Sequence, residues 1–148
     1  MMKHIIIFLA VSILFIFVSA KAKSLELVMF HSKYCGYCIA FDKEVGFDYN
    51  TLEIAKTLPL TIIDFNDPPK WIIDALLGES IRPVTATPTF VVWSEKLNKE
   101  IDRLVGYKDR KWFIGAIQFW IDNHKLFYDE DGNLRPDAPP MPKPATLI

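Results

Sequence analysis

The hydrophobic and polar positions along the chain form two kinds of segment that alternate with one another. Short apolar runs rich in branched and aromatic side chains are typical of buried strands, and segments of mixed spacing are typical of helices. The runs that predict strands span residues 25–30, 60–65, 88–93 and 100–107. The segments that predict helices span residues 35–45, 51–58, 71–77 and 110–127.

Residues that start or stop helices lie at the predicted boundaries. Thr51 is expected to cap the second helix, and Asp109 is expected to open the fourth. Gly46 is expected to end or kink the first helix, and Gly78 to end the third. The turn at 94–99 would join the last two strands into a hairpin.

The order of these elements predicts the class of fold. One crossover joins the first two strands and one hairpin joins the last two, so the strands form a mixed sheet. We therefore predict an α/β fold with a central mixed β-sheet and helices on both of its faces. A single domain is expected over residues 24–127, followed by a proline-rich, disordered tail over residues 128–148.

The N-terminal segment has the layout of a secretory signal peptide. Lys3 precedes an apolar run at 5–18, and Val18 and Ala20 occupy the positions that a signal peptidase reads. We predict that residues 1–20 are a signal peptide and that the chain is exported after cleavage behind Ala20. The run is shorter than the roughly 20 residues of a spanning helix, which makes an uncleaved membrane anchor the lesser alternative.

Composition and charge exclude some classes of partner. The 148 residues are 51% hydrophobic, which is ample for one packed core. The formal net charge is -1, and the sequence contains no cluster of lysine and arginine. Such a chain creates no field that gathers phosphate groups, so we expect no nucleic-acid partner.

The two cysteines of the chain are the candidate reactive groups. Cys35 and Cys38 are separated by two residues in HSKYCGYCIAF, between a predicted strand and a predicted helix. Free N–H groups and the helix dipole stabilise a thiolate there, so Cys35 is the expected nucleophile and Cys38 the expected resolving thiol. Cys35 would attack a substrate disulfide, and Cys38 would then form the Cys35–Cys38 disulfide and release the substrate. Gly36 and Tyr37 lie between the sulfurs and are expected to tune the pair.

The cysteines could instead form a structural disulfide or bind a metal ion. A structural crosslink would close so small a loop that it restrains the unfolded chain little. A zinc site wants four ligands, and only Cys35, Cys38 and His31 lie together in the sequence, so we expect no resident metal or other cofactor. A copper-binding carrier that uses these three residues is the alternative from another class of function.

The strand–CxxC–helix arrangement, together with TATPTF downstream, resembles the thioredoxin superfamily over approximately residues 25–127. The resemblance implies a thioredoxin fold, thiol–disulfide oxidoreductase activity and a cis Thr87–Pro88 peptide bond that faces the cysteine pair. It also implies that Thr87 and Pro88 bind the substrate and that Gly106 lets the substrate approach the same surface. Tyr34 replaces the family's usual tryptophan before the pair and is expected to cover the disulfide.

The segments LVMFHSKYCGYCIAFDKEV, TPTFVVW and LVGY are similar to small periplasmic thioredoxins of the SoxS type, found with sulfur-oxidation systems. This resemblance implies a monomeric periplasmic reductase of protein or small-molecule disulfides and thiol adducts, supplied by a membrane electron donor of the DsbD type. The tetrapeptide CGYC, with threonine before the proline, instead resembles disulfide isomerases of the DsbC type, so an oxidase or isomerase is the alternative. The stretch from Cys38 to Pro88 is too short for the helical insertion of those isomerases.

One departure from the family concerns proton transfer. The cytoplasmic reductases carry a buried acid six residues before the first cysteine, where it assists proton transfer to the second, and here that residue is Met29. The family's lysine in the middle strand is also missing. Glu26 and Asp64 are the acids that remain to be considered, besides water.

Overall fold

The computed structural model describes residues 25–129 and 135–137. In this part of the chain four strands form one sheet in the order β2–β1–β3–β4. The strands are β1 (Leu25–His31), β2 (Leu60–Asp64), β3 (Thr89–Ser94) and β4 (Lys99–Val105). β1 runs parallel to β2 and antiparallel to β3, and β3 pairs antiparallel with β4. The predicted mixed sheet is therefore confirmed.

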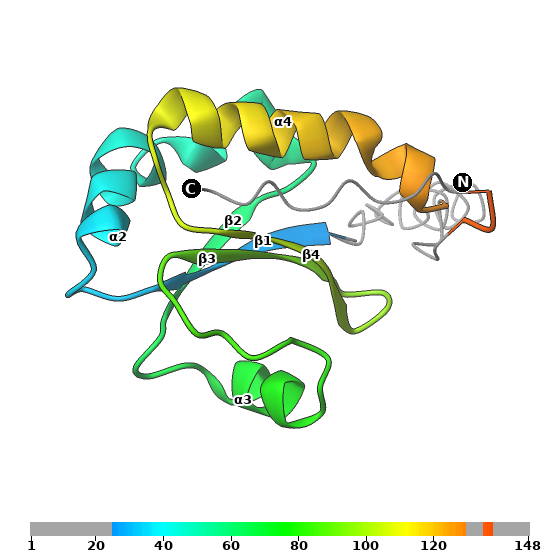
Figure 1. Ribbon diagram of the computed structural model, residues 1–148, viewed down its shortest axis with the longest axis horizontal. Helices are drawn as coiled ribbons and strands as arrows, with labels where there is room; N and C mark the ends of the chain where they lie inside the picture. The colour runs from blue at the N-terminus through cyan, green and yellow to red at the C-terminus, as the bar shows by residue number, and fades with distance from the viewer. Residues whose placement is uncertain (1–24, 130–134, 138–148) are drawn as a thin grey trace, which may run out of the picture.

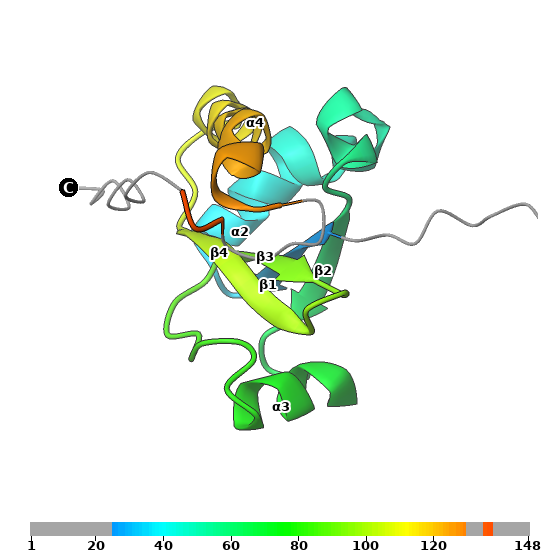
Figure 2. The same ribbon diagram turned by 90° about the vertical axis from the view of Figure 1, so that its right-hand side faces the viewer.

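Helices cover both faces of this sheet. The α-helices are α2 (Gly36–Phe41), α3 (Lys70–Leu77) and α4 (Arg110–Phe127). α2 and α4 lie over one face of the sheet, and α3 lies over the other (Figures 1 and 2). The predicted α/β architecture with helices on both faces is thus confirmed.

The first predicted helix has two parts. α2 is followed directly by a π-helical segment, Asp42–Gly46, so Gly46 ends the helical stretch as predicted. The last helix opens at Asp109, whose carboxylate accepts the backbone N–H of Trp112 at 2.8 Å. Both boundaries follow from local sequence signals.

The second predicted helix is wrong in type. Two short 3-10 segments, Tyr49–Thr51 and Glu53–Lys56, replace it, and the Thr51 hydroxyl donates to the Asp48 carbonyl (2.7 Å) without capping a helix. The buried Tyr49 hydroxyl donates to the Leu58 carbonyl at 2.9 Å. Such tertiary bonds hold the segment as a compact link, and tertiary context overrides local helix propensity.

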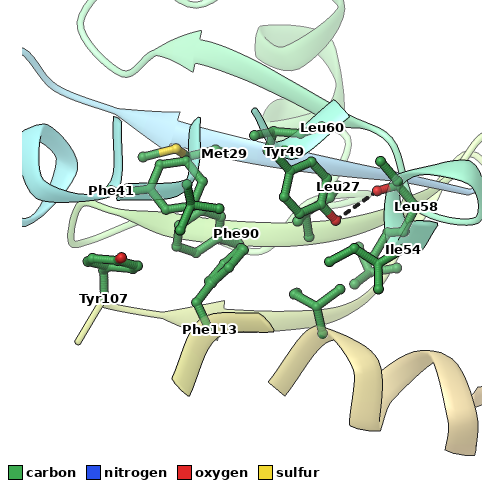
Figure 3. Packing of buried hydrophobic residues seen from close by; sticks show 14 of the residues in the cluster. Leu27, Met29, Phe41, Tyr49, Ile54, Leu58, Leu60, Phe90, Tyr107 and Phe113 are labelled. Atoms are coloured by element: carbon green, nitrogen blue, oxygen red, sulfur yellow. Dashed lines mark hydrogen bonds between the residues drawn. The ribbon is translucent and has the colours of Figure 1, made fainter. Parts of the chain in front are cut away.

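Two hydrophobic clusters hold the layers together. The larger lies between the sheet and α4 and includes Phe41, Phe90 and Phe113, whose ring centroids are 4.7–5.0 Å apart (Figure 3). Cys38 belongs to this cluster, so the second thiol is buried between α2 and the rest of the core. The smaller cluster joins the other face of the sheet to α3.

Some predictions concern residues outside the described ranges. The predicted signal peptide (1–20) lies there, as do 130–134 and 138–148 of the predicted tail. Tyr128, the first residue of that tail, donates its hydroxyl to the Ile101 carbonyl in β4 (3.1 Å). Among the residues that the structure describes, no helix combines the length and apolar character needed to cross a membrane.

Candidate active site

Cys35 lies where the chain leaves β1 and enters α2. It is the N-cap residue of the helix, with extended backbone angles, and its sulfur accepts the backbone N–H of Cys38 (3.2 Å). A helix N-terminus presents free N–H groups and positive partial charge, which favour a negatively charged cap. The local geometry therefore suits a thiolate at Cys35.

A second segment, distant in sequence, approaches the same sulfur. The Thr87–Pro88 peptide bond is cis, the geometry that the resemblance to thioredoxins implies. The Cys35 thiol donates to the Thr87 carbonyl at 3.2 Å. The Gly106 N–H donates to the Pro88 carbonyl at 2.8 Å, which attaches the end of β4 to this segment. Cys35, Thr87, Pro88 and Gly106 thus come together.

The two thiols have pKa values displaced in opposite directions. Burial works to raise the pKa of Cys35, but hydrogen bonds from Cys38, Thr87 and the Tyr37 backbone outweigh it, so the pKa is lowered. Burial also raises the pKa of Cys38, and the hydrogen bond and charge of Cys35 add to this effect, bringing it to about 11. Cys35 is therefore the thiol that ionises first, and only a thiolate attacks a disulfide.

The exposure of the two sulfurs matches this difference. Cys35 is partly exposed and Cys38 is fully buried, and both are free thiols in the structure. The structure therefore describes the reduced pair, and the Cys35–Cys38 disulfide stays a prediction for the oxidised form.

The two tyrosines beside the cysteines lie on the outside. Tyr34 is 82% exposed and Tyr37 is 65% exposed. The Lys33 ammonium lies 5.1 Å from the centroid of the Tyr34 ring. The structure describes the reduced pair, so the expected cover of the disulfide by Tyr34 stays a prediction.

His31 does not join the cysteines. Its Nε2 lies 2.8 Å from Oδ2 of Asp42, a contact that the sequence analysis did not anticipate. Within the described ranges no group of three histidine, cysteine, aspartate or glutamate side chains is arranged to hold a metal ion. The copper-carrier alternative, which needs Cys35, Cys38 and His31 together, therefore lacks its site there.

Comparison with protein families and solved structures agrees with this geometry. The family described as a thioredoxin-like domain matches residues 16–120. The chain belongs to this thioredoxin-like family. A search of curated proteins found no match.

Among solved structures, the periplasmic thioredoxin SoxS from Paracoccus pantotrophus, in its reduced form, is 29% identical with a TM-score of 0.54. The match covers 68% of this chain and 98% of that one. A thioredoxin from Thermus thermophilus is 23% identical with a TM-score of 0.50, over 68% of this chain and 75% of that one. A thioredoxin from Malassezia sympodialis is 20% identical with a TM-score of 0.50, over 66% and 77%. The last two support the fold alone.

Membership of the thioredoxin-like family and the CxxC pair identify the chain as a thiol–disulfide oxidoreductase that is similar to SoxS. Thioredoxin-like proteins act on protein substrates that carry disulfides. The family and activity implied by the sequence are therefore confirmed.

Glu26 and Asp64, the candidate acids for proton transfer, accept hydrogen bonds from other residues of this thioredoxin-like domain. Glu26 pairs with Trp93 in the sheet register, on the face that packs against α3, and its carboxylate accepts from the Thr61 hydroxyl. Asp64 is exposed, and its Oδ1 accepts the backbone N–H of Asn66 at 2.9 Å. Neither acid takes the place of the missing acid at Met29.

A buried charge cluster, which the sequence analysis missed, holds the segment before the cis-proline. The Glu100 carboxylate accepts from the Arg82 backbone N–H (2.9 Å) and from Nε of Arg103 (2.6 Å). Arg103 also donates to the carbonyls of Arg82 and Pro83, at 2.9 and 3.1 Å. β4 therefore fixes the segment that leads to Thr87. Isolated Arg and Glu in a strand pattern gave no signal of this pairing.

Replacing Gly106 by alanine is expected to destabilise the thioredoxin-like domain by about 1–3 kcal/mol, because a side chain at this backbone conformation is strained. Gly106 has φ +88°, and an added Cβ would meet no atom within 4 Å, so backbone strain alone is tested. Gly115 is the control, since it lies in α4 with open space around it and alanine should stabilise the helix by up to ~1 kcal/mol. Urea unfolding of the two variants measures the difference, and an unchanged stability of Gly106→Ala would contradict the strain.

Proposed function

We propose that this protein is an exported reductase in which Cys35 attacks disulfides and Cys38 resolves the mixed disulfide. The observation that carries this proposal is the opposite displacement of the two pKa values, lowered at Cys35 and raised at Cys38. The thiol with the lowered pKa ionises before the other, which stays protonated at neutral pH. This asymmetry is what a nucleophile and a resolving thiol require.

The first step consumes the thiolate of Cys35. Its sulfur attacks one sulfur of the substrate disulfide, a new S–S bond forms, and the other substrate sulfur leaves with the electron pair as a thiolate. Before the attack, the Cys38 N–H donates to the Cys35 sulfur, and this bond stabilises the negative charge of the thiolate.

The second step consumes the thiol of Cys38. After losing its proton, Cys38 attacks the Cys35 sulfur, the bond between Cys35 and the substrate breaks, and the second substrate thiolate leaves. The substrate disulfide has gained two electrons, and the protein holds the Cys35–Cys38 disulfide. Return to the starting state needs a dithiol donor.

Thr87, Pro88 and Gly106 are proposed to bind the substrate backbone. In the reduced protein the Thr87 carbonyl accepts the Cys35 thiol proton. Ionisation of Cys35 removes that proton and leaves the carbonyl available for a backbone N–H of the substrate, in the manner of strand addition. Substrate pairing and thiolate formation would then favour one another. Exposed Tyr34 and Tyr37 flank this surface, and Gly36 and Tyr37 tune the pair.

The reductive direction and the compartment are proposed on the similarity to SoxS, described as a periplasmic thioredoxin in reduced form. We propose that residues 1–20 are a signal peptide, that 24–127 form the working domain, and that 128–148 form a tail. Outside the cytoplasm a CxxC pair oxidises unless electrons are supplied, so a membrane donor of the DsbD type is part of the proposal. The chain would act as a monomer on protein or small-molecule disulfides and thiol adducts.

Replacing Cys38 by alanine is expected to trap substrates as mixed disulfides, because the resolving step is lost while Cys35 still attacks. Substrates should be recovered bound to Cys38→Ala from the exported compartment and released by dithiothreitol. The matched control is Cys35→Ala in the same background, which should trap nothing. Recovery of no mixed disulfides, with Cys35 still reactive towards iodoacetamide, would contradict the proposal.

A further inference from the structure

The Cys38 thiol needs a proton acceptor for the resolving step. It is fully buried, and its pKa is raised to about 11, so at neutral pH almost none of it is thiolate. The residue at the family's acid position is Met29, which is also fully buried. Glu26 and Asp64 are bonded to other residues, as described above. The proton must therefore pass to water or to another group near Cys38.

Asp42 lies one helical turn after Cys38. Its backbone N–H donates to the Cys38 carbonyl, which sets the two residues four apart on continuous helix. Side chains at this spacing lie on the same face of a helix, with Cβ atoms about 5–6 Å apart. Asp42 therefore lies one turn beyond Cys38 on the same face of the helical stretch.

His31 approaches the same place from the end of β1. Its Nε2 lies 2.8 Å from Oδ2 of Asp42. A backbone hydrogen bond from the next residue, Ser32, works to lower the pKa of the Cys38 thiol. Two consecutive residues of the chain, His31 and Ser32, thus approach Asp42 and Cys38, which lie one helical turn apart.

We propose that the His31–Asp42 pair accepts the proton of the Cys38 thiol during resolution of the mixed disulfide, in place of the acid that the family carries at the position of Met29. The inference rests on the proposed function. The pair does not contact the substrate and acts only through Cys38.

The His31–Asp42 pair is accessible to solvent, to which it can pass the proton. The His31 side chain is 18% exposed and the Asp42 side chain 43% exposed, so solvent reaches the pair, whereas the Cys38 thiol is buried. The charged neighbours are Asp64, which stands opposite His31 in the register with β2, and Lys43 and Lys33, which are exposed.

The chemistry of the step balances without any further reactant. The S–H bond of Cys38 breaks, its proton passes to the pair directly or through one water, and the sulfur keeps the electrons. The new Cys35–Cys38 bond forms as the bond from Cys35 to the substrate breaks, and the substrate sulfur leaves as a thiolate. The pair then returns its proton to that thiolate or to solvent.

The test separates the two steps on one protein. Reduced protein reacts with excess 5,5′-dithiobis(2-nitrobenzoate), and stopped flow follows two releases of thionitrobenzoate. The first release reports attack by Cys35, and the second reports resolution by Cys38. For Asp42→Asn and His31→Gln at neutral pH, we expect the second phase to slow by roughly 10–100-fold, at or below the usual range for general-base loss. The first phase should stay within about two-fold, since Cys35 keeps its hydrogen bonds.

The pH profile distinguishes proton transfer from a structural defect. The second phase of the variants should rise with pH and approach the wild-type rate above about pH 9–10, as hydroxide deprotonates Cys38. Asp42→Glu, which keeps the carboxylate, should restore most of the rate. Asp74→Asn is the charge-matched control, because Asp74 also binds a basic partner, Lys70 (2.6 Å), but lies on α3 over the other face of the sheet. Both of its phases should match wild type.

Three results would contradict the inference or the proposed function. An unchanged second phase in Asp42→Asn and His31→Gln would overturn the inference, and so would a slowing that is equal at all pH values. Absence of the first phase in the wild-type protein would instead contradict the proposed function itself.

Discussion

Replacing Cys35 by serine is expected to reduce disulfide reduction to the uncatalysed level. A hydroxyl does not ionise in this pH range, so the hydrogen bonds that lower the pKa of Cys35 have no thiolate to stabilise. Reduction of a disulfide-bonded protein such as insulin by dithiothreitol, with and without the variant, measures the loss. The buried Cys38 should not take over the attack, because its pKa is about 11.

The pH dependence of alkylation checks the same point in the Cys38→Ala background, although that variant also loses the hydrogen bond with Cys38. Only the thiolate reacts, so a lowered pKa means that the reaction of Cys35 with iodoacetamide persists below the pH at which an ordinary thiol ionises. The rate should fall only as the pH drops through the lowered pKa of Cys35. In the complementary Cys35→Ala variant, Cys38 should resist alkylation well into the alkaline range, because burial raises its pKa. Equal profiles for the two variants would contradict the asymmetry.

Replacing Glu100 by glutamine is expected to destabilise the protein by roughly 3–5 kcal/mol, the usual cost of removing one partner from a buried ion pair. The Glu100 side chain is 3% exposed, and Arg103, at 15%, would keep its charge but lose the Glu100 carboxylate as its partner. Glu53→Gln is the control, since Glu53 and Lys56 form an exposed pair whose loss should cost at most about 1 kcal/mol. Urea unfolding of both variants gives the comparison, and equal stabilities would contradict a structural role for the cluster.

The stability that Glu100 supplies should depend on pH in one direction. Burial opposes ionisation of Glu100, but hydrogen bonds from Arg103 and Arg82 outweigh it and lower the pKa. A carboxyl whose pKa is lower in the folded state stabilises the protein above the unfolded-state pKa. This stabilisation is lost as the pH falls through the folded-state value. Wild type and Glu100→Gln should therefore approach one another in stability under acid conditions.

The parts of the fold that depend on local pattern were predictable. Apolar runs predicted all four strands of the described sheet, because buried strands need continuous apolar side chains. Asp109 and Gly46 marked helix boundaries, because caps act within one turn. The helix predicted to begin at Thr51 was wrong, because the Tyr49 hydroxyl hydrogen-bonds the Leu58 carbonyl and holds the segment in 3-10 turns.

The candidate active site also has a part that the sequence predicts and a part that it does not. Cys35 and Cys38 were predictable from spacing and from their position between a strand and a helix. The hydrogen bond between His31 and Asp42 was not predictable, because it depends on the path of the loop that connects β1 to α2. The Glu100 cluster was equally hidden, since it joins β4 to a segment 18 residues earlier through tertiary contact. Local signals thus reveal the reactive pair, and only the folded chain reveals the groups that support it.

The redox state of the Cys35–Cys38 pair in living cells tests the proposed reductase most directly. Cells are quenched with acid, free thiols are labelled with a maleimide of high mass, and the mobility of the exported chain is compared with fully reduced and fully oxidised standards. We predict that most of the protein carries two labels at steady state, and that it becomes oxidised when the membrane donor is inactivated. A pair that is mostly oxidised in unperturbed cells would contradict the reductive direction and favour a disulfide oxidase.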